Sequence, residues 1–175
     1  VGSAIDDVRA GDHVVFQFSA GCGRCRRCVE GRPQVCERAR VAKGQLPDDW
    51  RVHLPVFETG ASVATRSASG KTLAALAEVL PELWGGSADL AESNNTTIEG
   101  ALSFIPKDRS ARLWKGDPYA GRVLHFGVRE HAMGSIMNGI AASSGTRVFG
   151  GTFLTFSDYM RGSVRLAAIM GLPVT

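Results

Sequence analysis

The chain has 175 residues, a hydrophobic content of 44% and a formal net charge of +3. This is enough apolar material for one packed domain with a small appendage. No apolar run approaches the ~20 residues of a membrane span, and no signal-peptide pattern is present, so we expect a soluble, cytoplasmic protein without membrane contact. Six arginines lie between Arg24 and Arg40 with no aromatic residue among them, which argues against a nucleic-acid-binding platform.

A cysteine-rich loop follows the first predicted strand, which covers residues 13–18. Cys22, Cys25, Cys28 and Cys36 lie within fifteen residues of one another. Four thiolates at this spacing can surround one tetrahedral zinc ion, and the neighbouring arginines favour the thiolate form. A site of four sulfurs leaves no position open for a substrate, so the predicted zinc is structural. Reduced free cysteines and an adventitious disulfide are the alternatives.

Residues 1–40 resemble the structural-zinc loop of medium-chain zinc-dependent alcohol dehydrogenases. The resemblance includes the run VGSAIDDVRAGDHVV upstream of the cysteines. The catalytic zinc ligands and the nicotinamide-binding domain of that family lie outside such a stretch, so the resemblance implies no dehydrogenase activity here. Residues 41–54 then form a predicted junction, with prolines, charges and no sustained period.

Helical and strand patterns alternate from residue 55 onward. An amphipathic helix is predicted over residues 67–80, with serines at its start to cap it. A short strand at Leu83 and Trp84 follows and ends in the sequence GGSAD. A polar loop of about thirty residues comes next, a length that is typical of functional or disordered loops.

Residues 122–141, RVLHFGVREHAMGSIMNGIA, predict a strand, a turn at Gly127 and a helix with a buried face. This places Glu130 beyond the carboxyl end of a strand, where ligands bind in open parallel sheets. A glutamate in the first turn of a helix also favours the helix dipole without any function. The flanking His125 and His131 are interpreted as structural.

The last predicted elements are a strand over residues 147–156, with internal glycines, and an apolar helix. Ser157 or Asp158 is expected to cap this helix, which runs to Met170, is apolar nearly all round and should be buried. The final sequence, GLPVT, has the character of a further strand's first residues. The order of elements predicts an α/β fold, namely an incomplete parallel sheet with flanking helices, preceded by a small zinc-loop segment.

Four blocks within residues 46–175 resemble the start of the pyrimidine-binding domain of transketolase, in order and spacing. They are ATRSASG, LPELWGGSADLAESNNTTI, LHFGVREHAMGSIMNGIA and GGTFLTFSDYMRGSVRLAAIMGLPV. The resemblance implies a domain of thiamine-diphosphate-binding type over residues 55–175. It also implies a transferase of the pentose phosphate pathway, which moves a two-carbon ketol unit between sugar phosphates with thiamine diphosphate and a Mg or Ca ion.

The resemblance assigns cofactor-binding roles. Glu130 resembles the catalytic glutamate that hydrogen-bonds the pyrimidine ring nitrogen and promotes the imino tautomer, which takes the proton from the thiazolium carbon. Asp89 resembles an aspartate near the thiazolium ring, and a plain turn residue is the alternative. Phe153, Phe156 and Tyr159 resemble the aromatic pocket around the pyrimidine, and ordinary core packing is the alternative.

Arg66 and Ser93 resemble two residues that hold the phosphate end of the sugar substrate, for which a guanidinium fork and a hydroxyl are suitable. The family's diphosphate- and metal-binding domain, with its Gly-Asp-Gly motif, is not among these residues. We therefore expect the chain to carry a partial active site and to be inactive alone, whereas the parent enzyme is a homodimer. A fragment of a zinc-dependent alcohol dehydrogenase and a non-catalytic zinc-binding module are the alternative functions.

Overall fold

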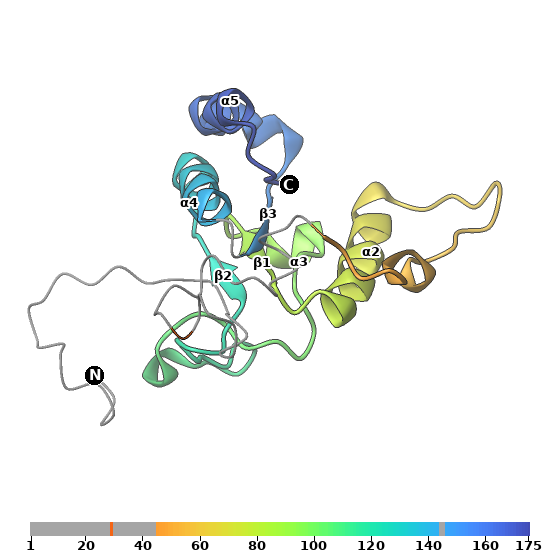
Figure 1. Cartoon of the computed structure of the whole chain (residues 1–175), viewed down its shortest axis with the longest axis horizontal. Coiled ribbons are helices and arrows are strands. Elements are labelled where there is room, and N and C mark those ends of the chain that lie inside the picture. The colour runs from red at the N-terminus through yellow and green to blue at the C-terminus, as the bar shows by residue number, and fades with distance from the viewer. Residues whose placement is uncertain (1–28, 30–44, 144–145) are drawn as a thin grey trace, which may run out of the picture.

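The computed structural model describes residues 29, 45–143 and 146–175 (Figure 1). The described part is built around a small parallel sheet with helices on both faces. The strands are β1 (Leu83–Ser87), β2 (Val123–His125) and β3 (Arg147–Gly151). The helices are α2 (Thr65–Val79), α3 (Ala91–Asn94), α4 (Glu130–Ala142) and α5 (Arg161–Met170). The 3-10 helices are η3 (Trp50–His53), η4 (Lys107–Arg109) and η5 (Leu154–Met160).

The sheet has the strand order β2-β1-β3, so the strand that comes first in sequence lies in the centre. Gly86 of β1 pairs with Leu124 on one side and with Gly150 on the other. A Cβ atom at Gly86 would collide with the carbonyl oxygen of Leu124, so this position requires glycine. Since all three strands are parallel, their carboxyl ends open at the same edge of the sheet.

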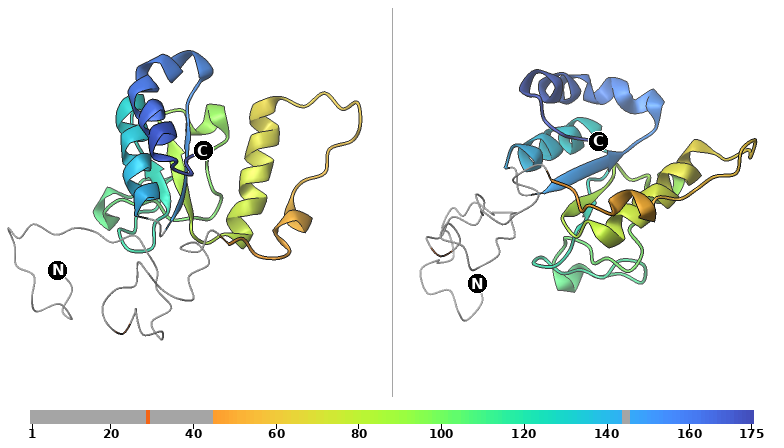
Figure 2. Two further views of the ribbon diagram at one scale, coloured as in Figure 1. Left: turned by 45° about the horizontal axis from the view of Figure 1, so that its top comes forward. Right: turned by 45° about the vertical axis from the view of Figure 1, so that its right-hand side comes forward.

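The two faces of the sheet carry separate core clusters, and Figure 2 shows α4 and α2 on opposite sides of it. On one face Met133 of α4 packs with Leu124 and Val148. On the other face residues of α2 pack with Val123 and Phe149. Adjacent strand residues thus point to opposite faces, as the pleat requires. These findings confirm the predicted α/β class and the parallel sheet with flanking helices.

Some boundaries differ from those predicted. Helix α2 begins at Thr65, and its N-cap, Ala64, makes no side-chain hydrogen bond, so the predicted serine cap is wrong. Strand β1 continues through the glycines to Ser87. Strand β3 ends at Gly151, where its neighbour β1 also ends, because Ser87 and Gly151 are the last paired residues. The following residues form η5 instead of more strand.

The predicted burial of the last helix is wrong. Helix α5 begins at Arg161 after η5, so neither Ser157 nor Asp158 is its cap. Only Ser163 and Ala167 of this helix are buried. Its large apolar side chains are each more than half exposed, namely Val164, Leu166, Ile169 and Met170. Small side chains therefore form the contact with α4, and the large ones form an outer face.

The final residues extend the sheet beyond β3. Val174 forms a parallel bridge with Val148, and the amide of Gly150 donates to the carbonyl of Thr175 at 2.8 Å. This confirms the expected first residues of a further strand. No helix within residues 45–143 and 146–175 has the length and apolar content that crossing a bilayer requires.

Candidate functional site

The carboxyl ends of the three strands bring distant parts of the sequence to one edge of the sheet. Asp89 follows β1 by two residues, Glu130 follows β2 by five, and Phe153 follows β3 by two. Parallel strands of an open sheet typically bind ligands at this edge. The structure thus gives Glu130 the position that the sequence pattern predicts, at the start of a helix beyond a strand.

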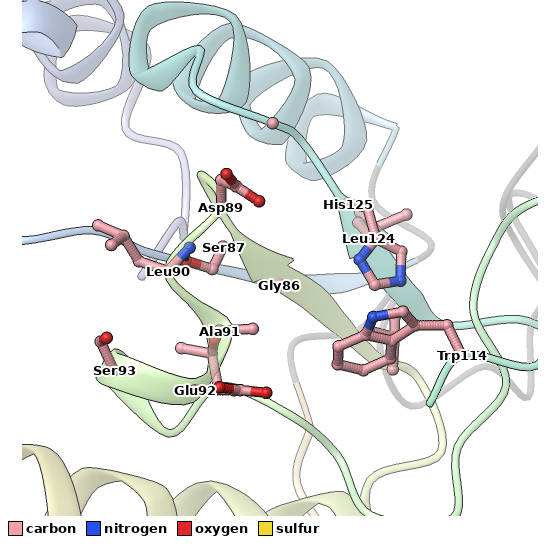
Figure 3. A pocket seen from close by; sticks show the side chains of 13 residues that line it. Gly86, Ser87, Asp89, Leu90, Ala91, Glu92, Ser93, Trp114, Leu124 and His125 are labelled. Carbon is pink, nitrogen blue, oxygen red and sulfur yellow. Dashed lines mark hydrogen bonds between the residues drawn. The ribbon is translucent and has the colours of Figure 1, made fainter. Parts of the chain in front are cut away.

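A cavity of about 330 Å³ opens at the ends of β1 and β2 (Figure 3). Asp89, Glu92 and Ser93 lie on one side of it, and Trp114 and His125 lie across from them. The backbone of Asp89 has a positive φ of 61°, a left-handed conformation that aspartate tolerates better than most residues. The cavity therefore combines carboxylates on one wall with an imidazole and an indole on the other.

Two neighbours hold the imidazole of His125 in place. Its Nε2 atom lies 2.9 Å from Oγ of Ser103, and the ring of Trp114 meets it edge-on with 4.7 Å between the ring centroids. Burial lowers the pKa of His125 below its ordinary value of 6.5, so the ring is neutral at pH 7. The interpretation of His125 as structural stays a prediction, and the structure adds that this residue lines the cavity. Its position as the last residue of β2 was the available signal.

A larger hollow of about 1380 Å³ lies between α2 and β3. Three of the predicted residues line it, namely Arg66, Ser93 and Phe153. The side-chain amide of Asn95 donates to the carbonyl of Arg66 at 3.3 Å and so ties the end of α3 to the start of α2. Arg66 and Ser93 therefore share one groove, as binding of a common phosphate group would require.

Glu130 is the first residue of α4 and is only 7% exposed. The turn before it uses Gly127 with a φ of +67°, and the guanidinium of Arg129 donates to the carbonyl of Phe126 at 3.1 Å. One turn further along, Met133 is fully buried and fixes the helix on the sheet. Glu130 thus begins a helix that is packed on the sheet one turn later, and it lines neither of the two hollows.

Phe153, the N-cap residue of η5, and Phe156 and Tyr159 within η5 form a row of rings. The ring centroids of Phe153 and Phe156 are 5.8 Å apart with 24° between the planes, and those of Phe156 and Tyr159 are 6.1 Å apart. The 3-10 geometry places residues three apart on one side. Phe153 is 39% exposed and Tyr159 is 68% exposed, so the alternative of ordinary core packing does not hold for these two. The row leaves aromatic surface open to a planar ligand.

The predicted zinc ligands, Cys22, Cys25, Cys28 and Cys36, lie outside the described residues. The zinc site consequently stays a prediction from the spacing of the cysteines. Among the residues that the structure describes, no group of three or more His, Cys, Asp or Glu side chains is arranged to hold a metal ion.

Comparison with known proteins connects this geometry with one family. Residues 61–175 match the family described as "Transketolase, pyrimidine binding domain". The transketolase of Mycobacterium tuberculosis is 58% identical over 134 residues, which cover 76% of this chain and 19% of the relative. The transketolase of Geobacillus stearothermophilus is 53% identical over 135 residues, which cover 77% of this chain and 19% of the relative.

Solved structures give the same result. A transketolase variant from Pichia stipitis in complex with fructose 6-phosphate aligns with a TM-score of 0.69 and 44% identity, over 77% of this chain and 20% of that one. The transketolase of Leishmania mexicana aligns with a TM-score of 0.67 and 42% identity, over 77% of this chain and 19% of that one. The chain therefore spans a minor part of the proteins that it matches.

Proposed function

Because the chain belongs to the family of transketolase pyrimidine-binding domains, we propose that it supplies the pyrimidine-binding half of a thiamine diphosphate site. The reaction served by that site is transfer of a two-carbon ketol unit between sugar phosphates. The observation that carries this proposal is the buried Glu130 at the ligand edge of the sheet, on a helix that packs against η5, the element that carries Phe156 and Tyr159.

The residues present fit such a cofactor. A flat ring with basic nitrogens needs an aromatic surface to stack on and a carboxyl with which a proton can be shared. The row of Phe153, Phe156 and Tyr159 offers the surface, and Glu130 offers the carboxyl. When bound, thiamine diphosphate supplies a thiazolium ring that stabilises a carbanion.

Each residue then has one task. Glu130 holds a proton between its carboxyl and a ring nitrogen, and the buried Met133 keeps the start of α4 in place. Asp89, at the mouth of the small cavity, sets a negative charge near a cationic ring. Arg66 and Ser93 bind the phosphate group of a sugar substrate in the groove, and a related transketolase binds fructose 6-phosphate.

The diphosphate and its Mg or Ca ion are assigned mainly to another domain. Within the described residues no cluster of metal ligands lies near these side chains. We expect the chain by itself to bind part of the cofactor and to be inactive, because the diphosphate-binding half of the site is assigned to another domain. In the full-length relatives a homodimer would bring the missing half-site from a second subunit.

Calorimetric titration of the purified chain with thiamine diphosphate and Mg tests the proposal. Glu130→Ala should weaken binding roughly 10- to 100-fold, since a hydrogen bond to a charged group contributes about 1.5–3 kcal/mol. Glu99→Ala is the matched control, because Glu99 is exposed and lines neither hollow. Equal affinities of wild type and Glu130→Ala, or no binding at all, would contradict the half-site.

We also propose that residues 1–40 form a structural zinc loop, joined by residues 41–54 to the domain at 55–175. Its support is the donor set, since four closely spaced thiolates are the ligands of closed zinc sites. Mass spectrometry under native conditions should find one zinc ion per chain, and Cys25→Ser should lose it. Free thiols without metal would exclude the zinc loop, and a lack of nicotinamide binding would exclude the dehydrogenase alternative.

A further inference from the structure

We propose that His125 binds a neutral oxygen of the sugar substrate, at the end of the sugar away from its phosphate. The ligand site is the cavity that His125 shares with Asp89 and Trp114 at the ends of β1 and β2 (Figure 3). This inference rests on the proposed function and adds a substrate contact and a substrate orientation to it.

Among the residues that the structure describes, the ring of His125 has a hydrogen-bond partner at one nitrogen only. Ser103, which contacts Nε2, is 1% exposed. Its own backbone is fixed, because its amide donates to the carbonyl of Lys115 at 2.8 Å and its carbonyl accepts from the amide of Asp117 at 2.9 Å. The residue His125 is nevertheless exposed where it lines the cavity, so its burial is only partial. We assign its second nitrogen, Nδ1, to the ligand.

The chemistry of the cavity favours hydroxyl or carbonyl groups over phosphate. Since burial lowers the pKa of His125, its neutral ring donates at one nitrogen and accepts at the other. The carboxylates of Asp89 and Glu92 on the facing wall accept hydrogen bonds from hydroxyls, whereas they repel a phosphate dianion. The indole of Trp114 adds an apolar surface against which the carbon chain of a sugar can lie.

The two hollows share a wall, and this sets the orientation of the substrate. Ser93 and Thr96 line both the small cavity and the large groove. Arg66, the cation suited to phosphate, lies on the groove side. A sugar phosphate anchored at Arg66 would therefore pass α3 and place its other end between Asp89 and His125.

Histidine-selective NMR tests this contact directly. The purified chain, labelled with 15N at histidine, is titrated with fructose 6-phosphate, and the His125 signals are identified by their loss in His125→Gln. We expect the ring nitrogens of His125 to shift, while those of His53 on η3 and of His131 on α4 stay in place. Inorganic phosphate alone should leave His125 unmoved, because the inference places phosphate at Arg66.

Affinities of variants give a second readout. His125→Ala should raise the dissociation constant for fructose 6-phosphate about 3- to 10-fold, the effect of one neutral hydrogen bond, and His125→Gln should change it less because it keeps polar groups. His53→Ala is the matched control, since His53 lies on η3 and lines neither hollow. An unmoved His125 at saturating ligand, an alanine variant with wild-type affinity, or no sugar-phosphate binding overturns the inference.

The thiamine diphosphate titration separates the two levels of failure. If the chain binds thiamine diphosphate through Glu130 while His125 does not respond to fructose 6-phosphate, only the substrate contact is wrong. If neither ligand binds, the proposed function fails as well.

Discussion

Two glycines of α4 allow the packing of this helix to be measured with a matched pair of substitutions. A Cβ atom on Gly134 would collide with the hydroxyl of Ser163, and it would lie 2.8 Å from the Cβ of Ser163 and 3.2 Å from Cε of Met160. Gly139, on the same helix, has no atom within 4 Å of such a Cβ. Alanine favours a helix over glycine by roughly 1 kcal/mol at either position, so a difference between the two variants reports on packing.

We expect Gly139→Ala to raise the free energy of unfolding by about 0.5–1 kcal/mol. Gly134→Ala has the same favourable effect on helix propensity, but overpacking costs about 1–3 kcal/mol. The free energy of unfolding should therefore fall, by up to ~2 kcal/mol. Contacts under 3.0 Å to the Cβ and Oγ of Ser163 place the expected loss in the upper half of this range.

Urea unfolding followed by circular dichroism measures both changes in the free energy of unfolding. The comparison requires that wild type and variants have the same slope of unfolding free energy against urea concentration. Adding Ser163→Gly to the Gly134→Ala variant should recover part of the loss, because it removes both close atoms. Equal stabilisation by the two alanine substitutions would refute the close packing of α4 on α5.

The other predictions concern the core, the pH dependence and the phosphate contact. Met133→Ala should lower the free energy of unfolding by about 2–5 kcal/mol in the same urea assay, since the side chain is fully buried. Burial lowers the pKa of His125 in the folded chain, so the unfolded chain binds that proton more readily and stability should fall as the pH drops below 6.5. Urea midpoints at pH 7.5 and 5.5 check this, and His125→Gln should reduce the difference. Arg66→Ala should weaken binding of fructose 6-phosphate, more at low than at high salt, and should leave binding of unphosphorylated fructose unchanged in calorimetry.

Hydrophobic periodicity predicts α2 and α4 because their large apolar residues pack directly on the sheet. Met133 and Met137 repeat at helical spacing and are buried, as the pattern indicates. The same reasoning fails for α5, where Ser163 and Ala167 face α4. Gly134 leaves room for a close approach of the two helices, and only small side chains fit between them. Hydrophobicity ranks which residues prefer the interior, whereas the distance between helices decides which of them fit.

In the candidate site, too, local sequence patterns predict some features, whereas others depend on contacts between distant parts of the chain. The sequence predicts the place of Glu130, because a strand, a turn and a helix are local patterns. It could not predict that Ser103, which is 22 residues away in the chain, would hold the ring of His125. The loop that contains Ser103 and Trp114 has no period of its own, so its contacts with β2 appear only in the folded structure. The shared groove of Arg66 and Ser93 likewise depends on the packing of α3 against α2.

The strand order sets a length scale for ligands at this edge of the sheet. Neighbouring strands are about 4.8 Å apart, so the loops after β2 and β3, which flank β1, start about 10 Å from each other. A ligand that contacts both outer loops has to be about that long, whereas one that bridges Asp89 and His125 needs to be only about half as long. The hydrogen-bonded spacing of the backbone therefore sets the coarse length scale of a ligand at this edge, and the side chains adjust its span and set the chemistry of each contact.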